Sequence, residues 1–497
     1  MLKVVTVLLG LFAMSSVSAQ SETYYVAPLG TTIAGTPVGT DALPFASINA
    51  AFASGKVKGG DTLLLKDGAY GAVTIKINAA FDVPVTIMSQ NAKAAQFDNI
   101  LLAGNTRNLT LKNLSVWPRD PAISSAYLVR SYTTVSDITV DGLDIRSELG
   151  AGDFMQWDAA RWEARKFNGI VLGGPRGIAI RNRTTGIYTG VSVGEDSQII
   201  NNIVNGFNGD ALRAVSRTTV RGNRVFNCVK TDANHDDGFQ SFASNGGSIT
   251  DLVLDSNVII EWTGTTDHPL RCTLQGIGMY DGPYDNLTIV NNLVSTTHSH
   301  GVSVYGARGA RIFNNTVVNT RGLTGLIPYI AVRPHKNGTP STDVLVANNV
   351  AMSFSGGASA INGVEYRNNS VIGTPSLKFQ NPAAFDYRPK ASSGYIDTAD
   401  ATVAPLKDVM GQKRPGGALP DRGAYETQVD GTALNTATLL TQSAEVIGTT
   451  AAGTTTTGTT TTGTTTTGTT TTGTTTTGTT TTTTTGGGGP KRIKIRN

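Results

Sequence analysis

The chain has 497 residues, of which 39 % are apolar and 15 % charged, and its formal net charge is +4. A chain of this length can bury a large core, and its 57 glycines are typical of many short strands joined by tight turns. Lys3 and the basic residues of the last seven positions account for the positive balance. The body between them has no net positive charge, so we do not expect nucleic-acid binding.

The first 19 residues have the features of a secretory signal. Lys3 precedes an apolar run at residues 4–14, and Val17, Ser18 and Ala19 form a small-residue cleavage site. The run is too short to span a bilayer, and no later segment approaches transmembrane length. We therefore expect a bacterial protein that is secreted or periplasmic, with no transmembrane segment.

Residues 20–428 carry the features of one solenoid domain. A helix-like stretch ending at Ala53 is expected to cap its open first coil. Further along, an apolar–polar–Asn–apolar pattern returns seven times, in steps of 21, 34, 35, 23, 34 and 20 residues. The segments are short, β-branched and alternating, which indicates strands, and the near-constant steps indicate stacked repeats. The repeated positions are Asn202, Asn223, Asn257, Asn292, Asn315, Asn349 and Asn369.

Stacked coils would place these asparagines above one another, with their amides hydrogen-bonded along the stack. The pattern therefore predicts an all-β fold, a right-handed parallel β-helix. In such a fold, side chains far apart in sequence line up on one outer face.

A second set of segments predicts which side chains line up. Asp210, Asp237, Gln275 and His300 begin similar strand segments, and adjacent strands lie about 5 Å apart. In this register Arg213, Gln240 and Ser303 form a parallel row. Both rows stay polar from coil to coil, which points to a binding or catalytic face.

Carboxylates are most concentrated at residues 234–240. Asp236 and Asp237 are adjacent, and Asp210 is expected one coil below. Three such groups repel unless a cation joins them, and Ca²⁺ binds six to eight oxygen ligands. The sequence thus predicts a calcium site, although aspartates before glycine also commonly cap turns.

Two parts of the chain carry a resemblance to a known group. Residues 24–70 and the closing segments at 386–389 and 421–426 resemble secreted β-helix polysaccharide lyases of the pectate-lyase-like superfamily. The Asp-Asp-Gly-aromatic motif resembles the calcium site of the family-nine pectate lyases. This resemblance implies Asp210, Asp236 and Asp237 as metal ligands, with Gln240 where that family has another aspartate.

A calcium-assisted lyase removes the proton α to a uronate carboxylate, and the resemblance implies a lysine base. This chain has no lysine between Lys230 and Lys336. Arg271 and His300 rank equally as candidate bases, ahead of Lys230. Candidate substrate-binding residues are Arg213, Gln240, Gln275, His298, Arg333, His335 and Lys336.

Three features stay open from the sequence. Trp157 and Trp162 lie in a helix-like insertion, where they either stack on sugar rings or pack the insertion down. Cys228 and Cys272 are the only cysteines, and the sequence does not determine whether they pair. Residues 429–490 form a Thr/Gly-rich linker, which is expected to be disordered, and residues 491–497 form a basic tail.

The favoured interpretation is a secreted, monomeric polysaccharide lyase. It would cleave an acidic, uronic-acid-containing polysaccharide by calcium-assisted β-elimination. Two alternatives remain: an inverting glycoside hydrolase of polygalacturonase-like type, and a non-catalytic glycan-binding β-helix adhesin.

Overall fold

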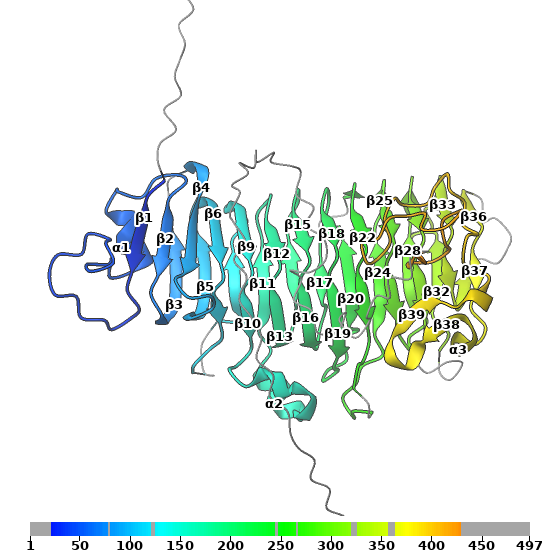
Figure 1. Cartoon of the computed structure of the whole chain (residues 1–497), viewed down its shortest axis with the longest axis horizontal. Coiled ribbons are helices and arrows are strands. Elements are labelled where there is room, and N and C mark those ends of the chain that lie inside the picture. The colour runs from blue at the N-terminus through cyan, green and yellow to red at the C-terminus, as the bar shows by residue number, and fades with distance from the viewer. Residues whose placement is uncertain are drawn as a thin grey trace, which may run out of the picture. The chain divides into compact units, whose positions relative to one another are not determined.

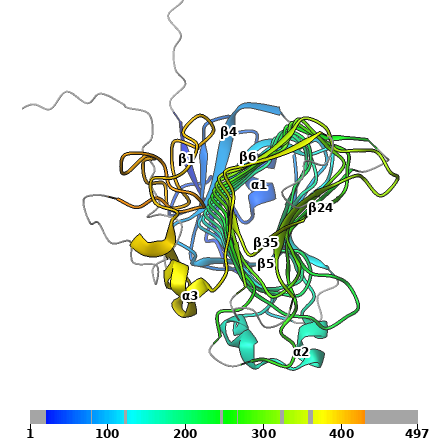
Figure 2. The ribbon, with the colours of Figure 1, turned by 90° about the vertical axis from the view of Figure 1, so that its right-hand side faces the viewer.

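The computed structural model describes residues 21–77, 80–120, 125–243, 247–264, 267–319, 326–355 and 363–428. The predicted signal at residues 1–19, the linker at 429–490 and the basic tail at 491–497 lie outside them. The described chain winds into successive coils that stack strand upon strand (Figures 1 and 2). This is the predicted parallel β-helix. None of the helices in these ranges is both long and apolar enough to cross a membrane.

Three long strand ladders run along the stack of coils. The first is a sheet of 13 parallel strands. Its strands are β1 (Thr23–Val26), β2 (Thr62–Leu65), β4 (Ala80–Ser89), β6 (Arg107–Lys112), β9 (Ser136–Asp141), β12 (Ile178–Ile180), β15 (Gln198–Ile200), β18 (Thr219–Arg221), β22 (Val253–Asp255), β26 (Thr288–Val290), β30 (Arg311–Phe313), β33 (Val344–Ala347) and β36 (Val364–Arg367).

The other two ladders share β3 (Gly68–Lys76) and β5 (Ala95–Ala103) as their first strands. The front ladder continues with β8 (Tyr127–Ser131), β11 (Asn168–Leu172), β14 (Val191–Val193), β17 (Leu212–Arg213), β20 (Asp237–Phe242), β24 (Gln275–Asp281), β28 (His300–Tyr305), β32 (Tyr329–Arg333) and β35 (Ser353–Ser355). The rear ladder continues with β7 (Ser115–Val116), β10 (Asp144–Arg146), β13 (Arg183–Ile187), β16 (Ile203–Phe207), β19 (Arg224–Cys228), β23 (Val258–Ile260), β27 (Leu293–Ser295), β31 (Thr316–Val318), β34 (Val350–Ala351) and β37 (Ser370–Val371).

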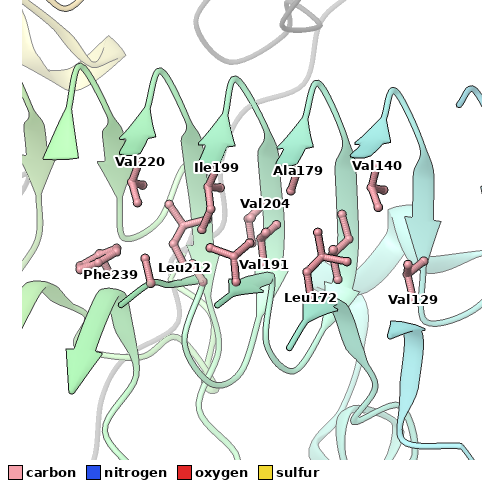
Figure 3. Close-up of a cluster of buried hydrophobic side chains, with 14 of the residues drawn as sticks. Val129, Val140, Leu172, Ala179, Val191, Ile199, Val204, Leu212, Val220 and Phe239 are labelled. Carbon is pink, nitrogen blue, oxygen red and sulfur yellow. The ribbon is translucent and has the colours of Figure 1, made fainter. Parts of the chain in front are cut away.

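The space inside the coils is filled by apolar side chains. Val129, Leu172, Val191, Leu212 and Phe239 come from consecutive front-ladder strands and point inward together (Figure 3). All of them are buried, so burial of this aliphatic stack is the main favourable contribution to folding. Helix α1 (Ile48–Ala53) adds Ile48 and Ala51 to the same core, and its role as a cap stays a prediction.

The predicted asparagine ladder is present and has one more member than expected. Asn182 donates from Nδ2 to Asn202 Oδ1 over 2.9 Å, and the same bond repeats up the stack to Asn369. The residue before several ladder positions, such as Asn201 and Asn291, has φ near +55°. Asparagine tolerates this left-handed backbone, which explains why the turn is often written Asn-Asn.

The C-terminal part of the described chain covers the outer side of the rear ladder. Helix α3 (Pro375–Lys378) and the antiparallel pair β38 (Phe379–Asn381) and β39 (Asp386–Pro389) begin this segment. Tyr387 and Tyr425 are buried there against rear-ladder residues such as Leu293 and Val318. This packing leaves the front ladder as the face on which the predicted polar rows lie.

The insertion between β10 and β11 settles the open question about the tryptophans. It contains the 3₁₀ helix η1 (Ala151–Gln156) and helix α2 (Ala159–Ala164). Trp157 and Trp162 are buried and lie edge to face, with ring centroids 5.0 Å apart, in a cluster with Phe154. They pack the insertion down and are not available to sugar rings.

Candidate functional site

The strand register of the front ladder aligns the two predicted polar rows. Asp237 pairs with Gln275, and His300 pairs with Tyr329. In the parallel row Arg213 pairs with Gln240, Gln240 with Gly278, and Gly278 with Ser303. The predicted row of Arg213, Gln240 and Ser303 is therefore confirmed from β17 to β28, with Gly278 between the last two, and the step from Asp237 to Gln275 is confirmed in the other row.

Glycines turn these rows outward. Gly238, Gly276 and Gly301 directly follow the row positions, and a Cβ at any of them would lie within 2.5 Å of a core side chain. Only glycine lets the backbone approach the core this closely. As a result, side chains three residues apart share the outer face. For example, His300 Nδ1 lies 2.8 Å from Ser303 Oγ.

Two carboxylates at the centre of the face are each hydrogen-bonded to a basic side chain. Asp210 is buried, and its Oδ2 accepts from Arg213 over 2.5 Å. Asp237 Oδ2 lies 2.8 Å from His235 Nδ1, and this hydrogen bond raises the pKa of His235. Burial raises the pKa of Asp237 to about 6, because desolvation disfavours the charged form.

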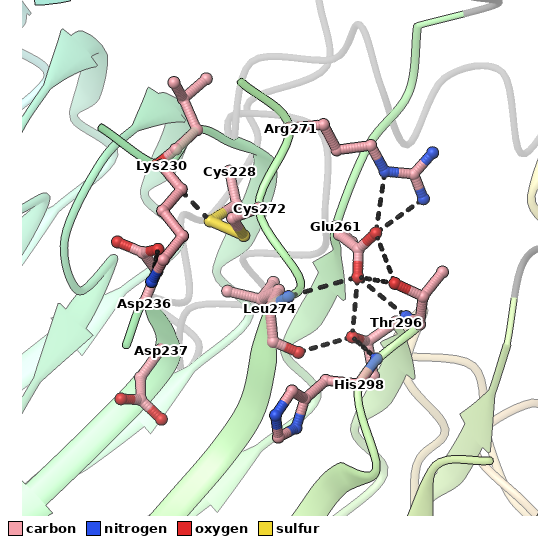
Figure 4. The surroundings of a disulfide bond; sticks show 12 residues. Cys228, Lys230, Asp236, Asp237, Glu261, Arg271, Cys272, Leu274, Thr296 and His298 are labelled. Carbon is pink, nitrogen blue, oxygen red and sulfur yellow. Dashed lines mark hydrogen bonds and ion pairs between the residues drawn. A yellow bond between two sulfur atoms is a disulfide. The ribbon is translucent and has the colours of Figure 1, made fainter. Parts of the chain in front are cut away.

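Asp236 does not join this pair, although it is adjacent in sequence. Its carboxylate points toward Lys230 and the disulfide, whereas that of Asp237 points away from them (Figure 4). The Asp236 oxygens have no hydrogen-bond partner among the described residues, and Lys230 Nζ lies 3.8 Å from Oδ2. Burial raises the pKa of Asp236 to about 7.

This placement does not bring the three predicted calcium ligands to one centre, so the calcium site stays a prediction. Among the described residues, the one group of three His, Cys, Asp or Glu side chains with all ligand atoms within 4.8 Å of one another is Cys228, Asp236 and Cys272. Both of those sulfurs are bonded to each other, so they are not free to bind a metal. The ligand set of Asp210, Asp236 and Asp237 is not brought together. Asp237 Oδ1, like both Asp236 oxygens, is buried without a hydrogen-bond partner among the described residues.

The disulfide and an adjacent ion pair determine where Arg271 lies. Cys228 and Cys272 are joined, with their Cα atoms 5.5 Å apart, which answers the question that the sequence left open. Arg271 Nη2 lies 2.6 Å from Glu261 Oε1, and the arginine side chain is only 10 % exposed. A guanidinium held by a buried carboxylate is a poor proton acceptor, so this geometry argues against Arg271 as the base.

Glu261 also organises the turn that carries His298. It is buried and accepts hydrogen bonds from Leu274 N, from Thr296 Oγ1 and from both N and Oγ1 of Thr297. Sequence reasoning missed Glu261. The available signal was a lone acidic residue at the end of the very apolar strand segment 258–260, which is typical of a buried, hydrogen-bonded carboxylate.

His300 lies at the centre of an aromatic cluster on the outer face. Its ring stacks on His298 at 5.1 Å and meets Tyr280 and Tyr329 edge to face at 5.3 and 5.2 Å. Tyr329 Oη lies 2.8 Å from His300 Nδ1. Burial lowers the pKa of His300 to about 4, so its imidazole is neutral above that pH. Burial also raises the pKa of Tyr329, so its hydroxyl keeps its proton.

Two of the predicted binding residues, Arg333 and His298, lie at this cluster. Arg333 lies over the rings of Tyr305 and Tyr329 at 6.0 and 5.6 Å and bonds Ser355 Oγ, with no carboxylate partner among the described residues. His298 Nδ1 accepts from His300 N over 3.0 Å.

The other four predicted residues have weaker links to the site. Gln240 Nε2 is 3.4 Å from Asp237 Oδ2, and Gln275 Oε1 is buried without a partner among the described residues. Lys336 donates to Asp281 over 2.6 Å, and His335 packs against Gly306. The sequence analysis assigned no role to Tyr280, Tyr305 or Tyr329.

Comparison with known proteins gives similarities in structure only. No family model matches the chain, and no curated protein matches its sequence. One similar solved structure is the pectate lyase Pel9A, at 17 % identity and a TM-score of 0.38, over 82 % of this chain and 97 % of that one. Another is the A-module of the mannuronan C-5 epimerase AlgE4 of Azotobacter vinelandii, at 14 % identity and a TM-score of 0.42, over 70 % and 96 %.

A third similar solved structure is the family-six alginate lyase AlyGC, at 14 % identity and a TM-score of 0.39, over 70 % of this chain and 51 % of that one. None of these similarities assigns a role to a residue of this chain.

Proposed function

We propose that this chain is an exported polysaccharide lyase that cleaves a uronic-acid-containing polysaccharide by β-elimination. The observation that carries the proposal is the hydrogen-bonded pair of His300 and Tyr329, which combines a neutral imidazole with a protonated phenol on the outer face. Arg333 beside them has no carboxylate partner of its own among the described residues. Elimination at a uronate requires a base, an acid and a positive group that binds the carboxylate, such as a guanidinium without a carboxylate partner.

The proposed chemistry assigns one task to each group. Arg333 binds the uronate carboxylate and withdraws its charge, which acidifies the proton at C5. In the tautomer with a proton on Nδ1, His300 Nε2 carries the lone pair and accepts that proton. A C4–C5 double bond forms as the bond from C4 to the glycosidic oxygen breaks. The Tyr329 hydroxyl protonates the leaving oxygen, and its bond to His300 lets the proton return.

The proposed mechanism leaves calcium out, because the three predicted calcium ligands do not share one centre. Arg213 and His235 hydrogen-bond Asp210 and Asp237, the carboxylates at which a cation was expected. We therefore derive no step from calcium. Of the other candidate bases, Lys230 lies beside Asp236, and Arg271 is held by Glu261.

Product analysis tests the proposal directly. The chain is incubated with polygalacturonate, alginate and glycosaminoglycans, and unsaturated uronate ends are followed by ultraviolet absorbance and mass spectrometry. His300→Ala and Tyr329→Phe are each expected to lower kcat by about 100-fold or more, the range for loss of a general base or acid. Tyr366→Phe is the matched control, because the Tyr366 hydroxyl donates to a backbone carbonyl, that of Ser355, and not to His300. If His300→Ala and Tyr329→Phe keep full activity, the assignment is wrong.

The inverting hydrolase remains a second candidate because of one observation. Burial raises the pKa of Asp236 to about 7 and that of Asp237 to about 6, so between these values Asp236 is mainly protonated, as a general acid must be, and Asp237 is mainly ionised, as a general base must be. Hydrolysis adds the mass of water to each product, whereas elimination does not. The same mass spectra therefore separate the two reactions.

A further inference from the structure

Arg130 on β8 lies between two aromatic rings at a distance from the proposed centre. Its guanidinium carbon is 4.3 Å from the ring centroid of Tyr127 and 4.9 Å from that of Tyr132. Tyr132 is 42 % exposed, which is unusual for so large a side chain. The rings orient the guanidinium through cation–π contacts without neutralising it.

The charge of Arg130 is uncompensated in the part of the chain that the structure describes. No carboxylate there forms an ion pair with it. Other surface arginines differ in this respect: Arg119 bonds Asp98 over 2.9 Å and Arg176 bonds Asp137 over 2.5 Å. A planar, pre-oriented guanidinium without an internal partner suits a carboxylate from outside, which it can bind through two parallel hydrogen bonds.

The strand register places Arg130 on the row of Arg213, Gln240 and Ser303, which runs beside the row of His300. Arg130 pairs with Val171, which pairs with Ser192, then with Arg213 and Gln240. Four steps of one strand spacing put the Arg130 backbone about 19 Å from that of Gln240, and two further steps reach the coil of His300. Arg130 and the His300–Tyr329 pair therefore lie on neighbouring rows of the same front ladder.

A groove lies on the coils that follow Arg130, at the C-terminal ends of the front-ladder strands. It has a volume of about 460 Å³, and its lining includes Val171, Ser192 and Val215 together with Gly173 and Gly194. Gly173 and Gly194 directly follow the last paired positions of β11 and β14, as Tyr132 follows that of β8, so these two coils carry no side chain there. Glu195 is its one carboxylate lining residue, and Arg217 pairs with it at 2.6 Å.

We propose that Arg130, with Tyr127 and Tyr132, forms a distal subsite that binds a uronate residue of the same polysaccharide chain whose cleavage occurs at His300. The guanidinium takes the carboxylate, the tyrosine rings pack on the sugar, and the groove carries the residues between. This rests on the proposed function for the identity of the ligand. It implies that the protein holds a long, extended polyanion and recognises short fragments poorly.

Binding without turnover tests the subsite. The full chain carrying His300→Ala is titrated calorimetrically with oligogalacturonates and oligoalginates from trimer to dodecamer. Affinity for the better polymer is expected to rise once the oligomer reaches Arg130. Adding Arg130→Ala should then weaken the long oligomers by about 10-fold, the lower end of the value of a charge-assisted hydrogen bond, and leave the trimer unchanged. Arg130→Lys should be intermediate, because an ammonium binds carboxylate as a point charge.

Arg176→Ala is the matched control, since Arg176 is exposed and pairs with Asp137. Melting temperatures of all variants show that each is folded. The inference is overturned if Arg130→Ala and Arg176→Ala bind long oligomers alike, or if neither polymer binds the protein. Failure of the proposed function looks different: no unsaturated product forms, while length-dependent binding through Arg130 persists.

Discussion

Asn257 offers a quantitative test of the ladder that holds the coils in register. Its Nδ2 donates to Val220 O and to Asn292 Oδ1, each over 2.9 Å. Its Oδ1 accepts from the backbone N and the Nδ2 of Asn223 at 3.0 and 2.9 Å. All three asparagines are buried. Asn257→Ala therefore leaves two buried donors of Asn223 without an acceptor.

Each orphaned donor costs about 1–3 kcal/mol, so we expect a loss of about 4 kcal/mol in the free energy of unfolding. The measurement is urea denaturation followed by circular dichroism, combined with hydrogen exchange. Because each coil contacts mainly its neighbours, exchange should accelerate chiefly in the coils around Asn223 and Asn292. Asn49→Ala is the control, since Asn49 is exposed and makes one bond to Thr74 O. If Asn257→Ala unfolds at the same urea concentration as the parent, the ladder does not stabilise the stack.

Three further predictions concern the site. Glu261→Gln should lower stability by about 3 kcal/mol, because it removes the buried counter-ion of Arg271 and leaves only the exposed Asp267 as its partner; an unchanged melting temperature would contradict this. Because the pKa of His300 is about 4, its basic form persists as pH falls, so the acid limb of kcat/KM should lie near pH 4. An acid limb near the ordinary histidine value of about 6.5 would argue against His300 as the base. Chelation with EDTA should leave the rate intact; a loss that calcium restores would reinstate a metal at Asp210 and Asp237.

The local pattern of the sequence was sufficient to predict the fold. Stacked coils need the same backbone turn and the same buried amide in each repeat, so Asn202, Asn257 and Asn315 recur at that position. This constraint is local and repeats, so it is visible in the sequence before any contact is known. The same repetition set the register that places Asp237 next to Gln275 and Arg213 next to Gln240.

The orientation of neighbouring side chains was decided only by the tertiary structure. Asp236 and Asp237 are adjacent, yet their carboxylates diverge, because successive side chains along an extended chain point to opposite sides. Sequence alone could not show that Arg213 compensates Asp210. Nor could it show that Glu261 binds Arg271, because these partners meet only once the coils stack. The fold follows from a pattern that every coil repeats, whereas the chemistry depends on contacts that occur once, and only the packed chain determines those.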